Sequence, residues 1–219
     1  MTEDGTSVIT ALKPIDAAAR RWSVEVNGTE VAKIGYERLT TLRLQRGTPW
    51  TAEIERAVTA AAAEDNLREY ALRVLARHPC SRARMDDKLR RRGGDDATRA
   101  ALLDDLERMG ILDDPTLADS VVRSELTRQP AGQRLLEQKL IAKGIDRGEA
   151  RRAVDDALDG RDPLSDALEA GTKKLRSLQR LPDVNTQRRR LYAFLARRGF
   201  DGDTCAEAVR RLIAERSDD

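Results

Sequence analysis

The chain has 219 residues, of which 40% are hydrophobic, 36% are charged and 3% are aromatic, so one or two domains must pack cores made mostly of Leu, Ala and Val. Two distant cysteines and a single histidine exclude a disulfide framework or a zinc site, and we expect no cofactor. The sequence has no signal-like N-terminus and no apolar run of about 18 residues, which excludes a membrane span and predicts a soluble cytoplasmic protein.

The N-terminal region predicts a small β structure. Residues 1–18 show no clear pattern and are expected to form a loose tail. Residues 19–65 begin with alternating apolar and polar residues on both sides of the Asn-Gly pair at 27–28, a strong signal for a two-residue hairpin turn. This register would pair Val24 with Val31. Because a two-stranded hairpin is marginal alone, we expect it to pack on the helical segment that follows.

Capping signals predict helices directly after the hairpin. Thr48 followed by Pro49 is typical of an N-cap with Pro at the first helical position. Asn66 with Glu69 three residues later resembles a capping box that starts a second helix, ended before Pro79.

From there on the sequence predicts helices only, three in each of the segments 67–112, 113–160 and 161–216. The helices are expected at about 67–77, 82–92, 96–109, 115–127, 132–143, 147–159, 163–180, 186–198 and 202–215. The short connections between them favour packing in sequence order.

The three segments share a motif that recurs about every fifty residues. Each copy has a leucine, three residues ending in Arg or Lys, and then Gly-x-Asp, with the glycines at positions 93, 144 and 199. Apolar residues also repeat eight positions before and ten positions after each glycine: Met85, Leu136, Leu191, Leu103, Val154 and Val209. One three-helix unit is therefore used three times.

Each motif glycine is expected to end a helix in a left-handed conformation, and the Asp two residues later to cap the next helix. We therefore predict a mainly α fold with three tandem three-helix repeats in an elongated arrangement, preceded by a small N-terminal β-hairpin plus helix region.

The net charge of +2 conceals two basic segments. Residues 68–99 carry ten basic against five acidic side chains, a local charge of +5, and residues 173–200 carry nine against one, a local charge of +8. Such patches favour a polyanion such as nucleic acid, or an acidic groove on a protein. Arg190 and Arg197 lie seven residues apart and share one helix face, while Leu191 points to the core.

The residues do not predict a catalytic site. The acidic pairs, such as Asp86 and Asp87, do not predict a metal-dependent nuclease, because adjacent helical side chains point about 100° apart. Tyr192, Phe194 and Phe200 are expected to pack in the core and not to stack on bases. We expect no enzymatic activity.

Four motifs resemble those of the bacterial RecX family. They are Arg-Ala-Arg-Met-Asp-Asp-Lys-Leu-Arg-Arg-Arg-Gly at 82–93, Met-Gly-Ile-Leu-Asp-Asp at 109–114, Gln-Lys-Leu-Ile-Ala-Lys-Gly-Ile-Asp at 138–146 and Arg-Arg-Leu-Tyr-Ala-Phe-Leu-Ala-Arg-Arg-Gly-Phe at 189–200. The resemblance covers about 67–215. Gly94 replaces a usual aromatic or aliphatic residue, and Leu117 a usual aromatic one, so looser packing is expected around the first repeat.

The resemblance implies a non-enzymatic modulator that lies along the groove of the RecA filament on single-stranded DNA and suppresses its ATPase, its strand exchange and its coprotease role in the SOS response. The expected partners are the RecA filament and single-stranded DNA, with double-stranded DNA as a further candidate, and the protein is expected to be a monomer. The candidate RecA- and DNA-binding residues form basic faces: Arg84, Lys88, Arg90, Arg91, Arg92, Lys139, Lys143, Lys173, Lys174, Arg188, Arg189, Arg190, Arg197 and Arg198.

Two other functions stay open on the residues alone. One is a general DNA-binding protein that sequesters DNA without touching RecA. The other is a helical repeat scaffold for a different protein.

Overall fold

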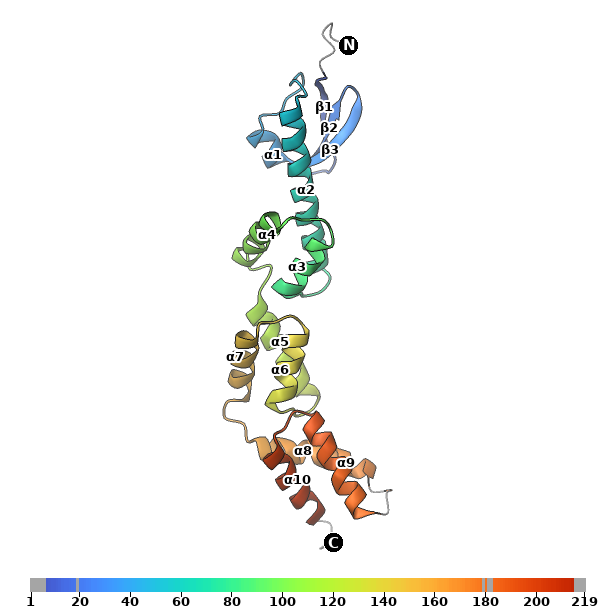
Figure 1. The fold of residues 1–219 in the computed structure, drawn as a ribbon, viewed down its shortest axis with the longest axis vertical. Helices are drawn as coiled ribbons and strands as arrows, with labels where there is room; N and C mark the ends of the chain where they lie inside the picture. Colours follow the sequence, from blue (N-terminus) through green and yellow to red (C-terminus); the bar gives the residue numbers. More distant parts are fainter. Residues whose placement is uncertain (1–6, 19, 179, 181–182, 215–219) are drawn as a thin grey trace. The chain divides into compact units, whose positions relative to one another are not determined.

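The computed structural model describes residues 7–18, 20–178, 180 and 183–214. The chain forms two compact units, one made of Met1–His78 with Asp86–Asp105 and the other of Pro79–Met85 with Leu106–Asp219. The described residues form ten helices and one small sheet (Figure 1), which confirms a mainly helical protein with a β region near its N-terminus. Among these residues no helix is long and apolar enough to cross a membrane.

The first unit contains a three-stranded antiparallel sheet in the order β1-β2-β3. Its strands are β1 Ile9–Pro14, β2 Arg21–Val26 and β3 Thr29–Gly35. The prediction of a loose tail over 1–18 is wrong for β1, because Ile9 is fully buried and pairs with Val26. Residues 1–6 of that predicted tail lie outside the described residues.

The β2–β3 hairpin turns at Asn27 and Gly28 as predicted, with φ of 49° and 84°. Its register differs from the prediction, because Val24 pairs with Ala32 and not with Val31. A β-bulge next to Val24 inserts one extra residue into β3. Val31 is that residue, and its side chain is 45% exposed.

Helix α1 spans Tyr36–Thr41 and helix α2 spans Ala52–Leu75. The predicted N-cap at Thr48 is wrong: the Thr51 side chain accepts the hydrogen bond from the Ile54 backbone N–H at 3.3 Å. The Thr48 hydroxyl instead accepts from the backbone of Gln45 in the preceding loop.

Helix α2 runs without a break through the position where a second helix was predicted to start. Asn66 and Glu69 do not cap a helix, because both side chains accept hydrogen bonds from the Arg21 guanidinium of β2. These contacts fasten the sheet to α2. The apolar face of the hairpin also packs on α2, as expected, in a core that includes Val24 and Val58.

The remaining helices agree with the predicted ones to within two residues at each end. They are α3 Arg82–Arg90, α4 Asp96–Arg108, α5 Asp114–Arg128, α6 Gln133–Ala142, α7 Arg147–Leu158, α8 Pro163–Leu178, α9 Val184–Arg197 and α10 Gly202–Ala214. Residues 179 and 215, at the predicted ends of α8 and α10, lie outside the described part. The boundary between the two units falls within α3 and α4. The bounds of the three repeats, 67–112, 113–160 and 161–216, stay a prediction.

The motif corners form as predicted. Gly93, Gly144 and Gly199 have φ of 86°, 84° and 88°, a backbone conformation that glycine adopts without steric cost. The carboxylates that follow cap the next helix: Asp95 accepts from Thr98 N–H, Asp146 from Gly148 N–H and Asp201 from Thr204 N–H. Each Gly-x-Asp is therefore a tight helix-to-helix turn.

Two further cores lie in the second unit. One contains Val122, Leu136, Leu140 and Val154 from α5, α6 and α7. The other joins α8, α9 and α10 through residues that include Leu191 and Leu195. Each core holds three successive helices together.

Packing at Gly94 is close, so the expectation of looser packing there is wrong. A Cβ atom on Gly94 would lie 2.9 Å from Leu67 Cδ1 and 3.0 Å from Arg99 Cγ. The Arg99 side chain occupies this place and pairs with Asp86 at 2.7 Å. Leu117 is half-buried against the core of α5, α6 and α7.

Candidate basic binding surfaces

Helix α9 carries the largest group of exposed cations among the candidate residues. Its sequence has no acidic side chain, and Arg188, Arg189, Arg190 and Arg197 are all exposed. Leu191 and Leu195 are fully buried on the opposite stripe. In the described part of the chain, none of these four arginines forms an ion pair within 4.0 Å, although Arg189 interacts electrostatically with the N-cap residue Asp183.

The C-terminal half of α8 extends this group. Phe194 lies on the same face of α9 as Arg190 and Arg197, four residues after one and three before the other. Lys174 of α8 lies over the Phe194 ring with its Nζ atom 5.9 Å from the ring centroid. Lys174, Arg190 and Arg197 therefore form one surface, which we call the α9 basic face. Lys173 lies beside it but forms an ion pair with Glu169 at 2.9 Å.

Arg198 does not belong to this face. Its side chain is only 15% exposed and pairs with Glu125 of α5 at 2.8 Å. The same guanidinium donates to the backbone carbonyl groups of Gln129 and Pro130. The prediction of Arg198 as a surface contact is corrected: it fastens the end of α9 to the loop before α6.

Lys139 joins the same internal network. Its ammonium group pairs with Glu125 at 2.6 Å, and the Glu125 side chain is 10% exposed. Burial acts to raise the pKa of Glu125, but the hydrogen bonds from Lys139 and Arg198 outweigh it and leave the pKa below its usual value. A buried carboxylate with two cationic partners is a structural unit. Lys139 reaches it from the surface, with a side chain that is 41% exposed, and stays a candidate contact.

The three arginines at the end of α3, residues 90–92, are all exposed but differ in their partners. Arg90 pairs with Asp87 one turn earlier, and the Arg92 guanidinium lies over the Tyr70 ring, 4.1 Å from its centroid. Arg91 is exposed, and no described residue forms an ion pair with it. Lys88 is half-buried on the same helix.

Arg84 and Lys143 meet at one corner of the second unit. The Arg84 guanidinium donates to the backbone carbonyl of Ala142 at the end of α6, at 2.6 Å. The backbone carbonyl of Lys143 accepts from the Ser81 hydroxyl at 2.7 Å, while the Lys143 side chain stays exposed. Arg84 is thus engaged in holding helices together.

The aromatic residues follow the prediction only in part. Phe200 is buried and Phe194 is half-buried against the core, as expected. Tyr192 is 42% exposed, because it lies about 100° around α9 from the buried Leu191. Its prediction as a core residue is wrong.

Comparisons with known proteins agree with this architecture. A family model described as "RecX, third three-helix domain" matches residues 162–209. The regulatory protein RecX of Chlorobaculum tepidum is 34% identical over 149 residues, which cover 68% of this chain and 89% of that protein. The chain belongs to the RecX family. The regulatory protein RecX of Thermobifida fusca is also 34% identical, over 70% of this chain and 84% of its own length.

Solved RecX structures share the fold. A crystal structure of regulatory protein RecX superposes with a TM-score of 0.73 at 20% identity and covers 95% of this chain and 99% of that one. The crystal structure of RecX from Lactobacillus salivarius superposes with a TM-score of 0.58 at 20% identity, and the match covers 68% of this chain and 96% of that one. The repeats of helices in this chain are thus the RecX architecture, and its named relatives are regulatory proteins.

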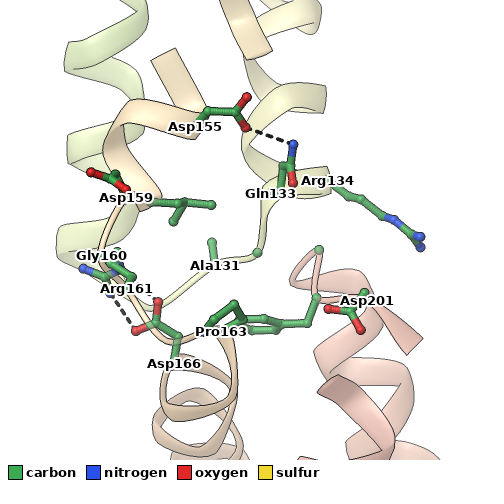
Figure 2. A pocket seen from close by; sticks show the side chains of 14 residues that line it. Ala131, Gln133, Arg134, Asp155, Asp159, Gly160, Arg161, Pro163, Asp166 and Asp201 are labelled. Carbon is green, nitrogen blue, oxygen red and sulfur yellow. Dashed lines mark hydrogen bonds and ion pairs between the residues drawn. The ribbon is translucent and has the colours of Figure 1, made fainter. Parts of the chain in front are cut away.

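A cavity of this RecX family member lies in the second unit, where α6, α7 and α8 meet the α9–α10 corner (Figure 2). Two pairs of its lining side chains bind each other: Gln133 donates to Asp155, and Arg161 forms an ion pair with Asp166 at 2.7 Å. Arg134 points away from the cavity in Figure 2. More aspartates than arginines line this cavity, which does not suit a polyanion, so the basic surface of α9 is the better candidate site.

Sequence reasoning missed Glu125, the acceptor at the centre of the Arg198 network. A signal for it exists, because Glu125 continues the buried stripe of Ala118 and Val122 along α5. An acidic residue on an apolar stripe indicates a buried partner of opposite charge. It does not identify which of the chain's many arginines that partner is.

Proposed function

We propose that this RecX family member is a non-enzymatic regulator of the RecA recombinase that binds the RecA filament on single-stranded DNA. Bound in this way, it inhibits the ATPase of RecA, its strand exchange and its coprotease activity in the SOS response. It acts in the cytoplasm as a monomer, and double-stranded DNA is a secondary ligand.

The observation that carries this proposal is the α9 basic face. Lys174, Arg190 and Arg197 come from two helices, and no described residue forms an ion pair with either arginine of this face. Unpaired cations on a rigid helix surface attract phosphate groups and release the counterions bound to them. Because Arg198 is engaged internally, this face is the expected contact with the phosphate groups of the filament.

The proposal is tested by the ATPase activity of RecA on single-stranded DNA, titrated with this protein well below one molecule per RecA subunit. Binding to bare DNA is measured at the same salt concentration. We expect inhibition at protein concentrations too low to cover the DNA. The double variant Arg190→Glu/Arg197→Glu should lose most of the inhibition. Arg210→Ala is the matched control, because Arg210 lies in the same repeat and pairs with Glu207.

The outcomes separate the three functions. Inhibition only after the DNA is saturated would contradict direct action on the filament and favour a DNA-sequestering protein. Unchanged DNA and RecA effects in the double variant would favour a scaffold for another partner.

A further inference from the structure

The three Gly-x-Asp corners have the same backbone geometry. The glycine N–H donates to the carbonyl three residues earlier, and the next N–H donates to the leucine carbonyl five residues before it. This pattern is identical at Gly93, Gly144 and Gly199. What the three corners contact can therefore be compared directly.

The second corner is occupied by the first turn of α3. The Ser81 hydroxyl donates to the carbonyl of Lys143, and Arg84 donates to the carbonyl of Ala142. A Cβ atom on Gly144 would lie 2.7 Å from Ser81 Oγ. The missing side chain is thus what lets the helix approach.

The third corner is occupied by the first turn of α6, here through backbone donors. The N–H of Gly132 donates to the carbonyl of Arg198 at 2.9 Å, and the N–H of Arg134 donates to that of Gly199 at 3.3 Å. A Cβ atom on Gly199 would lie 2.3 Å from the backbone nitrogen of Leu135. Two of the three corners therefore accept hydrogen bonds from the N-terminal turn of a helix.

The first corner has the same shape but no such occupant among the described residues. Nothing lies within 4 Å of a Cβ atom placed on Gly93, and Gly93 itself is exposed. No hydrogen bond from elsewhere in the described part of the chain reaches the carbonyl oxygens of Arg92 and Gly93. The corner is an unused copy of a surface that the chain fills twice elsewhere.

The corresponding position of α9 lies inside the helix and cannot donate to a corner as the starts of α3 and α6 do. Ser81, Gly132 and Gln187 each lie twelve residues before the motif glycine of their repeat. Helix α9, however, begins before Gln187, at Val184, with Asp183 as its N-cap. Gln187 therefore lies inside the helix and is buried. A second copy of the chain cannot offer α9 to the open corner in the way that α3 and α6 are offered internally.

We propose that the open corner at Gly93 binds the N-terminal turn of a helix in the partner protein. Backbone carbonyls accept hydrogen bonds from N–H and hydroxyl donors, and they repel phosphate oxygens, so the corner suits protein and not DNA. The exposed Arg91 beside it favours the acidic side chains that are common in the first turn of helices. The inference rests on the proposed function, which makes that partner a RecA subunit, and it assigns the α3 corner to protein and the α9 basic face to phosphate.

The test is Gly93→Asn, measured by binding to RecA filaments on single-stranded DNA and to bare single-stranded DNA at the same salt. Asn tolerates a left-handed conformation better than other side chains, and its Cβ enters open space in the free protein. On docking, this Cβ would collide with the incoming helix, as a Cβ on Gly144 or Gly199 would collide with its neighbour. We expect the affinity for the filament to fall about tenfold, because about two hydrogen bonds are lost. The affinity for bare DNA should not change. Gly110→Asn is the matched control, since Gly110 also has a positive φ and open space around it.

A second variant, Arg91→Glu, should weaken filament binding and leave bare-DNA binding within about twofold. If Gly93→Asn binds the filament as tightly as Gly110→Asn while both melt at the same temperature, the corner is not a docking site. Equal losses on filament and bare DNA would mean a phosphate contact and would also overturn the inference. If the wild-type protein binds bare DNA but not the filament, the proposed function fails first.

Discussion

Arg197 and Arg198 are neighbours with the same charge, and the fold gives them opposite roles. Arg197 is exposed on the α9 basic face, whereas Arg198 turns inward to Glu125 and two backbone carbonyls. The difference follows from one step of about 100° along the helix. Neighbouring arginines in a basic run can therefore have different roles, and the direction of each side chain decides which role it has.

Replacing Arg198 should cost stability, and replacing Arg197 should not. Arg198→Ala leaves the buried Glu125 with Lys139 as its one charged partner, so we expect a loss of about 2 to 4 kcal/mol in the free energy of unfolding. Arg197→Ala is the control and should change it by less than about 0.5 kcal/mol while weakening DNA binding. Urea unfolding and DNA binding of both variants check this. Similar stability for the two variants would contradict the internal role of Arg198.

The network should also respond to acid. The pKa of Glu125 lies below its ordinary value of 4.5 in the folded chain, so its ionised form stabilises the fold above the unfolded-state pKa, and this contribution is lost as the pH falls through the folded-state value. We expect the stability difference between the wild type and Glu125→Gln to be largest near neutral pH and to shrink below about pH 4.5. Unfolding measured across this range checks it. A difference independent of pH would show that ionised Glu125 contributes nothing.

At the scale of elements, the contact that recurs is one between the C-terminal end of one helix and the N-terminal turn of another. The corner at Gly144 receives α3 and the corner at Gly199 receives α6, with main-chain or side-chain hydrogen bonds at each contact. These contacts satisfy carbonyl groups that a helix C-terminus otherwise leaves to water. They also explain why glycine is needed there for two reasons, backbone conformation and close approach.

The two reasons can be separated by mutation. Gly160→Ala carries only the cost of a left-handed conformation, because its surroundings are open, and should lose about 1 to 2 kcal/mol. Gly199→Ala adds a collision with the Leu135 backbone at 2.3 Å, so we expect at least twice that loss or failure to fold. Thermal and chemical unfolding of the two variants make the comparison. Equal losses would mean that the α6 contact yields easily.

At the scale of the whole molecule, the near-neutral net charge of +2 does not describe how the protein meets a polyanion. Many cations are neutralised by neighbours within the fold, as Arg99 is by Asp86 and Arg68 by Asp105. The α9 basic face remains available. Binding to nucleic acid should thus depend on a few residues and be sensitive to salt.

The salt dependence of DNA binding measures how many of these cations meet phosphate. For single strands each neutralised phosphate contributes about 0.7 to the slope of log affinity against log salt concentration. Arg190→Ala/Arg197→Ala should reduce the slope by about 1.4, whereas Arg210→Ala, whose partner is Glu207, should leave it unchanged. Anisotropy titrations at several salt concentrations provide the slopes. A uniform fall for all arginine variants would indicate diffuse attraction without a defined face.

Local signals predicted most of the helical part. Gly-x-Asp needs only a left-handed glycine and a capping carboxylate, both set by residues within one turn, so all three corners and the bounds of the following helices agree with the structure. The misses occur where a distant residue competes. Asn66 has the local pattern of a helix start, but Arg21 takes its side chain, and Ile9 has no partner in its own segment until β2 pairs with it.

The sequence by itself determined the helical class, the repeat and its corners, and the RecX resemblance, because periodicity and capping act between residues a few positions apart. Only the tertiary structure decided which cations are free. Arg198 meets Glu125 across 73 residues and Arg84 meets Ala142 across 58, and no local pattern encodes such distances. Charge is a property of the residue, but its availability to a partner depends on contacts that form only when the repeats pack.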